Sequence, residues 1–513
     1  MRWSARRHEV SVAHDDVAGV ATGPVGRRTP LFWIAVVALL AGAIAMRLYL
    51  LGSPQSIEYD EGVYWQSLRA MQAGFHLYNP IFCSQPPLFL SLLYGLALPF
   101  GMSLAAIRMG VAVLSLSGVA GAALLGHALA GRRGALAALL LLVSDPFYLR
   151  CSQTVLAEAG CVGFALLAVG LAHKAGGRSR AGEAGRLAFL AGVAAAIGTL
   201  IKLLGIVSVI PVGLLLVHRV ALAWPESKRP KWEACVPLLC MAIGFLLSLA
   251  LPLLAFAGVL RDLWTGVWGF HIAAEAAFSA RNVTNFAIMT PVLRSLLGVS
   301  ALVGTCVAVL RRDWRVLPLL SWLAATFGLL SVHTPLWDHH LLLLLPPLIG
   351  LALIGLGRPS GAPSVGNRGI PEVAAVLLMV AVVVGNGRGT VTYYRERQAR
   401  ARDAGASLRS EFARDLRGHT RPGSWVITDD QFMAGLADRS TPPALADTSY
   451  VRIRSGYLTS HDLIEAASQP RVKALVFYSG RFWDARLADF DDWVPRNFRL
   501  LRQSDDGKEL WLK

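Results

Sequence analysis

The sequence predicts a polytopic α-helical membrane protein with a small C-terminal α/β domain. Of its 513 residues, 54% are hydrophobic, and the mean hydropathy is +0.50. Apolar runs of about 18–22 residues recur through the first three quarters of the chain, and each can cross a hydrocarbon core of about 30 Å. From about Thr390 the composition becomes mixed and charged, as in a domain exposed to water.

Hydropathy and loop charge together place about eleven membrane spans in the chain. The first is too long for the apolar part of a cleaved signal peptide, and no small-residue cleavage site follows it. An odd number of spans puts the two ends of the chain on opposite sides of the membrane. The expected spans are residues 31–51, 104–128, 135–150, 155–173, 187–201, 203–220, 235–257, 284–310, 316–332, 339–356 and 370–388.

The formal net charge of +16 is concentrated in the loops on one side of the membrane. This asymmetry is the positive-inside pattern, which makes the N-terminus cytoplasmic in an inner (plasma) membrane. A nucleic-acid partner is therefore not needed to explain the charge. The cytoplasmic group is Arg2, Arg6, Arg7, Arg27, Arg28, Arg132, Arg133, Lys174, Arg178, Arg180, Arg186, Arg219, Lys228, Arg229, Lys231, Arg311, Arg312, Arg315, Arg358 and Arg368, and the outer group is Arg69, Arg150, Lys202, Arg261 and Arg281.

Three regions are expected: a cytoplasmic tail (1–30), a transmembrane domain (31–389) and a periplasmic or extracellular α/β domain (390–513). In the α/β domain, "SWVITDD" and "VKALVFYSG" are typical of buried strands, with helical stretches between and after them. Neither GxGxxG nor GxxxxGK[ST] occurs there, so the motifs give no indication of nucleotide binding.

The first outer loop (52–103) is not polar throughout, and its apolar part is too short to span the membrane. Asp60 to Gln72 has the pattern of a short amphipathic helix, and Pro86 to Phe100 that of a helix lying in the interface. Cys83, in this loop, and Cys151 are both expected on the outer side, where they either form a disulfide or stay free. The other four cysteines lie in apolar segments and are expected to be core residues.

The segment "EYDEGVYWQSLRAMQAG" directly follows the first span and carries three carboxylates, Glu58, Asp60 and Glu61. Acidic residues are costly so close to hydrocarbon. A carboxylate there can act as a general base that removes a proton from an acceptor hydroxyl or amine. The alternative is a structural role at a helix N-terminus, where acidic residues interact favourably with the helix dipole.

Three further ionisable residues are expected at the outer membrane edge. Arg108 follows "QPPLFLSLLYGLALPFG" and either snorkels to the interface or pairs with a phosphate. Glu158 lies at the start of an apolar helix, where a lone carboxylate needs a partner or an aqueous cavity. Lys202, in "GTLIKLLG", is a lone cation at the outer end of a hairpin and either snorkels or binds an anion.

The segment "HTPLWDHHLLLLLPPL" places Asp338, His339 and His340 at the same edge. Adjacent histidines beside an acid are one pattern for metal binding. Neighbouring residues on an α-helix point about 100° apart, however, so a phosphate contact or an interfacial role is expected instead of a metal.

All these groups fall on one side of a topology derived only from Lys and Arg. This convergence predicts an outward-facing active site with acids for an acceptor and cations for an anionic lipid head. Two other classes stay open. A transporter or lipid flippase would carry structural repeats and polar residues at mid-membrane. A non-catalytic scaffold would leave the clustering of acids and cations unexplained.

The order and sidedness of these motifs resemble the C-type glycosyltransferases, in particular the bacterial relatives of protein O-mannosyltransferases and aminoarabinose transferases. The likeness covers roughly residues 31–356. The β-trefoil domain of the protein O-mannosyltransferases has no counterpart here, which puts a protein acceptor in doubt. The matching stretches are "YDEGVY", "QPPL", "AAIRMGVAVLSLSG", "GRRG", "TVLAE", "LIKLLGI" and "HHLLLLLPPL".

The resemblance implies a polyprenyl-phosphate-sugar donor, a glycan, lipid or protein acceptor, and inversion at the anomeric carbon. It implies that Asp60 is the catalytic base and Glu61 a supporting acid. It leaves a divalent cation open, because members of the family differ in metal use. Arg108, Lys202 and His339 or His340 would hold the donor phosphate, and the remaining candidates are Glu58, Tyr64, Gln85, Glu158 and Asp338.

Overall fold

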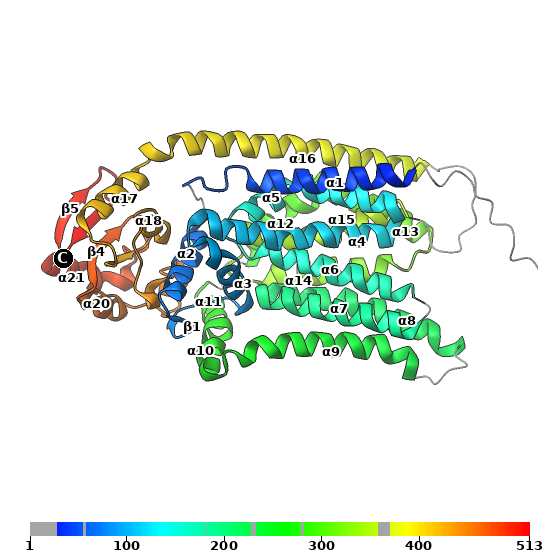
Figure 1. The fold of residues 1–513 in the computed structure, drawn as a ribbon, viewed down its shortest axis with the longest axis horizontal. Coiled ribbons are helices and arrows are strands. Elements are labelled where there is room, and N and C mark those ends of the chain that lie inside the picture. The colour runs from blue at the N-terminus through cyan, green and yellow to red at the C-terminus, as the bar shows by residue number, and fades with distance from the viewer. Residues whose placement is uncertain (1–27, 55–57, 179, 227–231, 279–281, 358–369) are drawn as a thin grey trace, which may run out of the picture.

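The computed structural model describes residues 28–513 except 55–57, 179, 227–231, 279–281 and 358–369. A bundle of long helices is capped at one end by a small mixed α/β domain (Figure 1). Residues 1–27 of the tail expected at 1–30 lie outside the described residues. The basic residues of 227–231 and 358–369 do so as well.

Helices occupy every segment expected to span. By length and composition, seven helices of the described part of the chain can cross a membrane, or eight if a bent pair counts as one span, and shorter apolar helices accompany them. The polytopic helical class is therefore confirmed. The helices of the bundle are α1 (Arg28–Leu48), α4 (Leu104–Ser144), α6 (Glu158–Gly176), α7 (Ala181–Ile201), η2 (Leu203–Ser208), α8 (Val209–Glu226), α9 (Trp232–Leu254), α12 (Asn282–Leu293), α13 (Leu296–Leu310), α14 (Val316–Val332), η6 (Asp338–Leu344), α15 (Leu345–Ile354) and α16 (Ile370–Asp403).

Helix α4 is a hairpin that covers two expected spans. The backbone turns at Gly131, whose φ of +63° suits a residue without a Cβ. Val119 and Leu139, on opposite arms, pack in one buried cluster. The second arm ends at Ser144 instead of continuing to residue 150 as expected, because Asp145 caps a new helix, α5 (Pro146–Gln153).

Two other expected spans differ in shape. The segment 284–310 is not one straight helix, because the chain bends by 72° between Leu293 and Leu296. Ser295 lies at the bend and caps α13 by accepting a hydrogen bond from the Gly298 amide. Helix α16 continues past the expected end of the last span, 388, as far as Asp403 and leads into the α/β domain.

The first outer loop forms the two expected helices, α2 (Tyr59–Gln72) and α3 (Leu88–Ala97), the latter continued by η1 (Leu98–Phe100). Between them are two short parallel strands, β1 (His76–Leu77) and β2 (Pro80–Ile81). A second set of short helices follows α9 at the same end: η3 (Ala257–Val259), α10 (Leu260–Trp264), η4 (Thr265–Gly269) and α11 (Phe270–Phe278).

The α/β domain has a four-stranded sheet in the order β3–β4–β6–β5, with β3 and β4 parallel and the other pairs antiparallel. The two expected strands are β3 (Trp425–Thr428) and β4 (Val472–Phe477). At the end of the chain, β5 (Arg499–Gln503) and β6 (Glu509–Leu512) form a hairpin. The sequence analysis expected helical stretches after β4 and did not predict these two strands. The helices are η7 (Ala404–Ala406), α17 (Leu408–His419), α18 (Gln431–Leu436), η8 (Pro443–Leu445), α19 (Tyr450–Arg454), α20 (Ser460–Ser468), η9 (Ala485–Leu487) and α21 (Ala488–Asn497).

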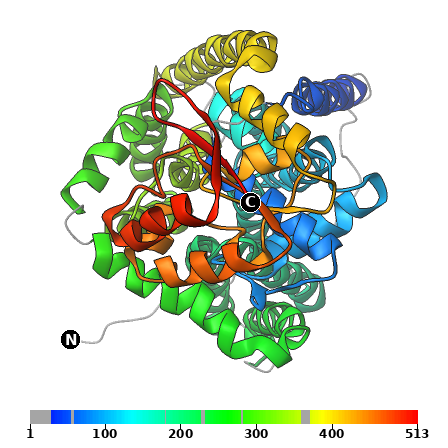
Figure 2. The ribbon, with the colours of Figure 1, turned by 90° about the vertical axis from the view of Figure 1, so that its left-hand side faces the viewer.

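The α/β domain covers the end of the bundle and docks on α2 (Figure 2). The Gln66 side chain donates to the backbone oxygens of Gln431 and Arg439 and accepts from the Thr441 amide. The ring of Trp65 lies edge-on to Phe432, 5.5 Å between centroids. This buried polar and aromatic contact fixes α2 between the two domains.

Gly62 tests this docking, because a Cβ at that position would overlap the Phe432 backbone. We expect Gly62→Ala to weaken the attachment of the α/β domain, seen as faster limited proteolysis near Asp403 and a lower midpoint of thermal unfolding. Gly95→Ala in α3 is the control, since its Cβ would meet nothing within 4 Å. Equal behaviour of both variants would contradict the docking.

Candidate active site

Glu61 and Arg108 form a closed, buried ion pair between α2 and α4. Arg108 donates from Nε and Nη2 to the two Glu61 oxygens, at 2.8 and 2.7 Å. Its Nη1 donates to the carbonyl oxygens of Leu51 and Ser53, and the Glu61 carboxylate also accepts from the Val155 amide. The two side chains are 2% and 0% exposed. Arg108 therefore does not face the site as a free phosphate ligand, contrary to expectation.

Glu58 and Asp60 lie at the start of α2, where Glu58 is the N-cap in extended conformation. Glu58 pairs with Arg150 at 2.6 Å and with His339 Nδ1 at 3.7 Å. Asp60 lies 3.9 Å from the other ring nitrogen of His339, and its side chain is 37% exposed. One histidine ring thus joins the two acids, and Asp60 is the more accessible of them.

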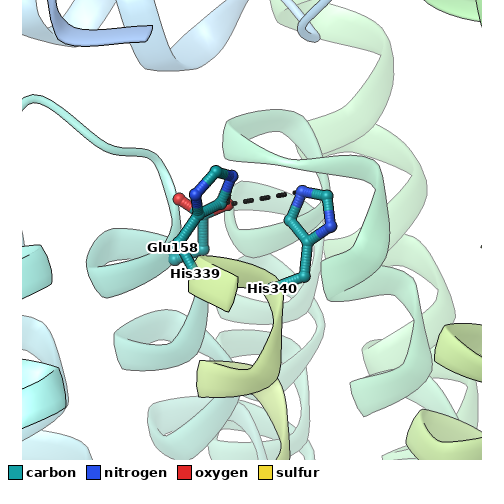
Figure 3. A group of neighbouring side chains, drawn as sticks. All are labelled: Glu158, His339 and His340. Atoms are coloured by element: carbon teal, nitrogen blue, oxygen red, sulfur yellow. Dashed lines mark ion pairs between the residues drawn. The ribbon is translucent and has the colours of Figure 1, made fainter. Parts of the chain in front are cut away.

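Glu158, the first residue of α6, is the centre of a second group of charges (Figure 3). Lys202, in the break between α7 and η2, makes a very close ion pair with Glu158 Oε1. The Nε2 atoms of His339 and His340 lie 3.7 and 3.9 Å from the same oxygen. Through His339 this group is continuous with Glu58 and Asp60.

The two adjacent histidines therefore converge, and the objection that they point apart was wrong. They lie on the 3₁₀ segment η6 instead of a regular α-helix. His340 Nδ1 accepts a hydrogen bond from the Trp337 amide, which turns Nε2 toward Glu158. The two rings are nearly perpendicular, 4.7 Å apart.

Among the residues that the structure describes, Glu158, His339 and His340 form a group that could hold a metal ion. Their ligand atoms lie within 4.8 Å of one another, and Glu158 Oε2 is buried without a hydrogen-bond partner. A carboxylate and two imidazoles suit Zn²⁺ or a similar ion. The ammonium group of Lys202, however, already neutralises Glu158, so a cation would have to displace it.

In the part of the chain that the structure describes, the other predicted residues form no ion pair or hydrogen bond with this group, although Asp60 and Glu158 are near enough to help raise the pKa of the buried Tyr64. Asp338 is exposed at the start of η6. Tyr64 is buried against Phe89. Gln85 lies in the loop before α3, and its carbonyl oxygen accepts a hydrogen bond from Tyr78. Cys83 and Cys151 are free, buried thiols and form no disulfide in the described structure.

Several neighbours of the site were not predicted as site residues. Arg150 pairs with Glu58, and the ring of His333 lies 4.8 Å from that of His340. From the α/β domain, Asp447 Oδ1 lies 3.3 Å from the Tyr59 hydroxyl, and the Thr448 amide donates to that hydroxyl. The contact of Tyr59 with Asp447 and Thr448 joins residues nearly 400 positions apart, so no local sequence pattern could predict it. The expected position of Arg150 on the outer side, by contrast, could have identified it as a site residue.

The environment shifts the pKa values of the two acids in opposite directions. Burial raises the pKa of Asp60, with Glu158 and Asp447 adding to the shift and His339 and Lys202 opposing it. Burial alone would also raise the pKa of Glu58, but His339 and Arg150 outweigh it and hold that pKa below its ordinary value. Two carboxylates with separated pKa values suit different roles.

Comparison with solved structures gives extensive matches at low sequence identity. ArnT from Cupriavidus metallidurans in the apo state is 14% identical, with a TM-score of 0.62 over 94% of this chain and 98% of that one. ArnT bound to undecaprenyl phosphate gives 14% and 0.61 over 93% and 97%. The Archaeoglobus fulgidus oligosaccharyltransferase, in complex with Zn and sulfate, gives 13% and 0.50 over 92% and 72%.

No protein-family model matches the chain, and no curated protein sequence matches it. The structural likeness covers the bundle and the α/β domain together, since nearly the whole chain aligns with ArnT. The chain therefore has the C-type glycosyltransferase fold, as the sequence motifs predicted.

Proposed function

We propose that this protein is a membrane glycosyltransferase that moves a sugar from a polyprenyl-phosphate donor to an acceptor nucleophile at the end of the bundle covered by the α/β domain. The observation that carries the proposal is the continuous group of acids and cations from Asp60 through His339 to Glu158 and Lys202. The fold shared with ArnT, whose structure has been solved with undecaprenyl phosphate, supports the choice of donor.

Asp60 is the residue best placed to act as the base. Its carboxylate is partly exposed and is not closed off by an arginine, unlike that of Glu61. It takes the proton of the acceptor hydroxyl while the acceptor oxygen attacks the anomeric carbon. The bond from that carbon to the phosphate oxygen breaks, and its electron pair leaves with the lipid phosphate. Attack from the opposite face inverts the anomeric carbon.

The leaving phosphate needs positive charge rather than a proton. Lys202 and the two histidines of η6 supply donors at one place, and Arg150 lies beyond Glu58. Such preorganised charge acts most strongly where water is scarce. Lys202 would exchange part of its contact with Glu158 for a contact with the phosphate. Glu158 would continue to orient the Lys202 side chain.

Glu61 and Arg108 act in this proposal as positioning residues. Their buried pair ties the start of α2 to α4 and to the segment that follows α1, so it fixes the position of Asp60. The α/β domain covers the opposite side of α2, where Tyr59 meets Asp447 and Thr448. An acceptor would therefore reach Asp60 along the junction of the two domains.

Asp60→Asn should lower sugar transfer by about 10²- to 10⁴-fold, the usual contribution of a general base. Transfer is measured with a panel of radiolabelled polyprenyl-phosphate sugars and protein in lipid nanodiscs. Asp338→Asn, which makes the same charge change at an exposed site in η6, should keep wild-type activity. Full activity of Asp60→Asn would remove Asp60 from the role, and accumulation of an intact substrate in vesicles would favour a transporter.

The pH dependence of kcat/KM should show the raised pKa of Asp60. The base works only when deprotonated, so activity is present above that pKa and is lost as the pH falls through it, at a pH above the ordinary 3.8. Asp447→Asn removes a like charge that raises the pKa, so the acidic limb should move to lower pH. An acidic limb that does not move would contradict the coupling.

Chelators should leave wild-type transfer unchanged, because Lys202 already supplies the positive charge beside Glu158. Lys202→Gln should raise the KM for the donor far more than that for the acceptor. Lys174→Gln, at the other end of α6, is the matched control. Loss of activity with EDTA and its recovery with Zn²⁺ or Mn²⁺ would instead assign Glu158, His339 and His340 to a metal.

A further inference from the structure

A polar cavity lies at the end of the bundle opposite to the α/β domain. It has a volume of about 290 Å³ and lies between the ends of α6 and α8 and the turn before α14. Its wall includes Gly176, the last residue of α6. The 19 residues of α6 separate it from Glu158 by about 27 Å at 1.5 Å per residue. The cavity is therefore not part of the candidate active site.

Two polar atoms in this cavity are buried without hydrogen-bond partners, His218 Nε2 and Arg219 Nε. Arg219 Nη2 donates to the Arg178 carbonyl oxygen, and within the described residues no carboxylate forms an ion pair with Arg219. Glu183 lies instead beside Arg178, 3.7 Å away, with both side chains about half exposed. A cationic side chain near a membrane edge is energetically costly when one of its buried N–H donors makes no hydrogen bond. An anion that accepts this hydrogen bond removes the cost.

Apart from Arg178, His218, Arg219 and the glycine at the end of α6, the cavity wall is apolar. The Trp314 ring stacks on His218 with 3.5 Å between centroids, and Leu215 and Leu222 continue the wall. Leu222 is 62% exposed and ends a candidate span that also contains His218 and Arg219. A soluble anion would make no favourable contact with this apolar side of the cavity. A phospholipid, by contrast, carries a phosphate and hydrocarbon chains in one molecule and can contact both sides.

We infer that this cavity binds the phosphate of an anionic phospholipid. The distribution of Lys and Arg makes this end cytoplasmic, and basic pockets between transmembrane helices at that face recognise anionic headgroups. The phosphate takes the donors of Arg219 and His218, and the glycerol and acyl chains lie against Trp314 and Leu222. The site does not depend on the proposed glycosyl transfer.

Native mass spectrometry of the full chain tests the inference, with phosphatidylglycerol and phosphatidylcholine of the same acyl chains as probes. We expect one phosphatidylglycerol to stay bound to the wild type and phosphatidylcholine not to replace it. Arg219→Gln should weaken that binding about five- to tenfold, the effect of about one basic contact. Trp314→Ala should also weaken it without changing the charge.

Arg180→Gln is the matched control, because this arginine is on the same face but its side chain is 84% exposed. Equal losses in Arg180→Gln and Arg219→Gln would overturn the site in favour of general surface charge. Displacement of the lipid by millimolar inorganic phosphate would overturn the lipid assignment in favour of a soluble anion. Thermal unfolding of each variant establishes whether it is folded. If Arg219→Gln does not fold, Trp314→Ala still tests the site.

Discussion

The site depends on the neutralisation of Glu158 by Lys202. A carboxylate that is 1% exposed at the start of an apolar helix is strongly unfavourable without a partner. Lys202 provides that partner only because the chain leaves helical geometry between α7 and η2. Removing one member of such a pair leaves a buried charge and typically costs about 3–5 kcal/mol. The contact therefore constrains the position of α6 relative to α7 and η2 as well as the chemistry.

A second buried pair, Glu61 with Arg108, orients the residues around it. Its donors and acceptors are occupied by one another and by backbone groups, which is the condition under which a buried ion pair is tolerated. Consecutive residues in α2 then differ in role. Glu61 faces α4, while Asp60 remains accessible beside His339. The α/β domain adds a third constraint on the same helix through Gln66 and Tyr59.

The sequence was sufficient for the helical class, for the helices α2 and α3, and for the strands β3 and β4, because each has an amphipathic pattern or a bounded apolar run of the right length. It placed a turn at residues 129–134, where α4 turns at Gly131, but it did not indicate the 72° bend before α13, which depends on one or two residues in an apolar segment. The hairpin β5–β6 was missed because polar residues obscure its alternation.

The candidate site was predictable as a set of charges but not as a set of contacts. Sidedness alone indicated that Asp60, Glu158, Lys202 and His339 belong to one end of the bundle. Which acid meets which base was not readable, as the pairing of Arg108 with Glu61 shows. The convergence of His339 and His340 depends on the 3₁₀ geometry of η6, and an α-helical assumption excluded it.

The most direct test of the central claim is a structure of the protein in lipid nanodiscs with a bound polyprenyl phosphate. The account predicts that the phosphate lies within hydrogen-bonding distance of Lys202 and of His339 or His340, with Asp60 facing the carbon that would carry the sugar. A phosphate bound away from these residues, with the Lys202–Glu158 contact unchanged, would contradict the assignment of this group of charges as the active site.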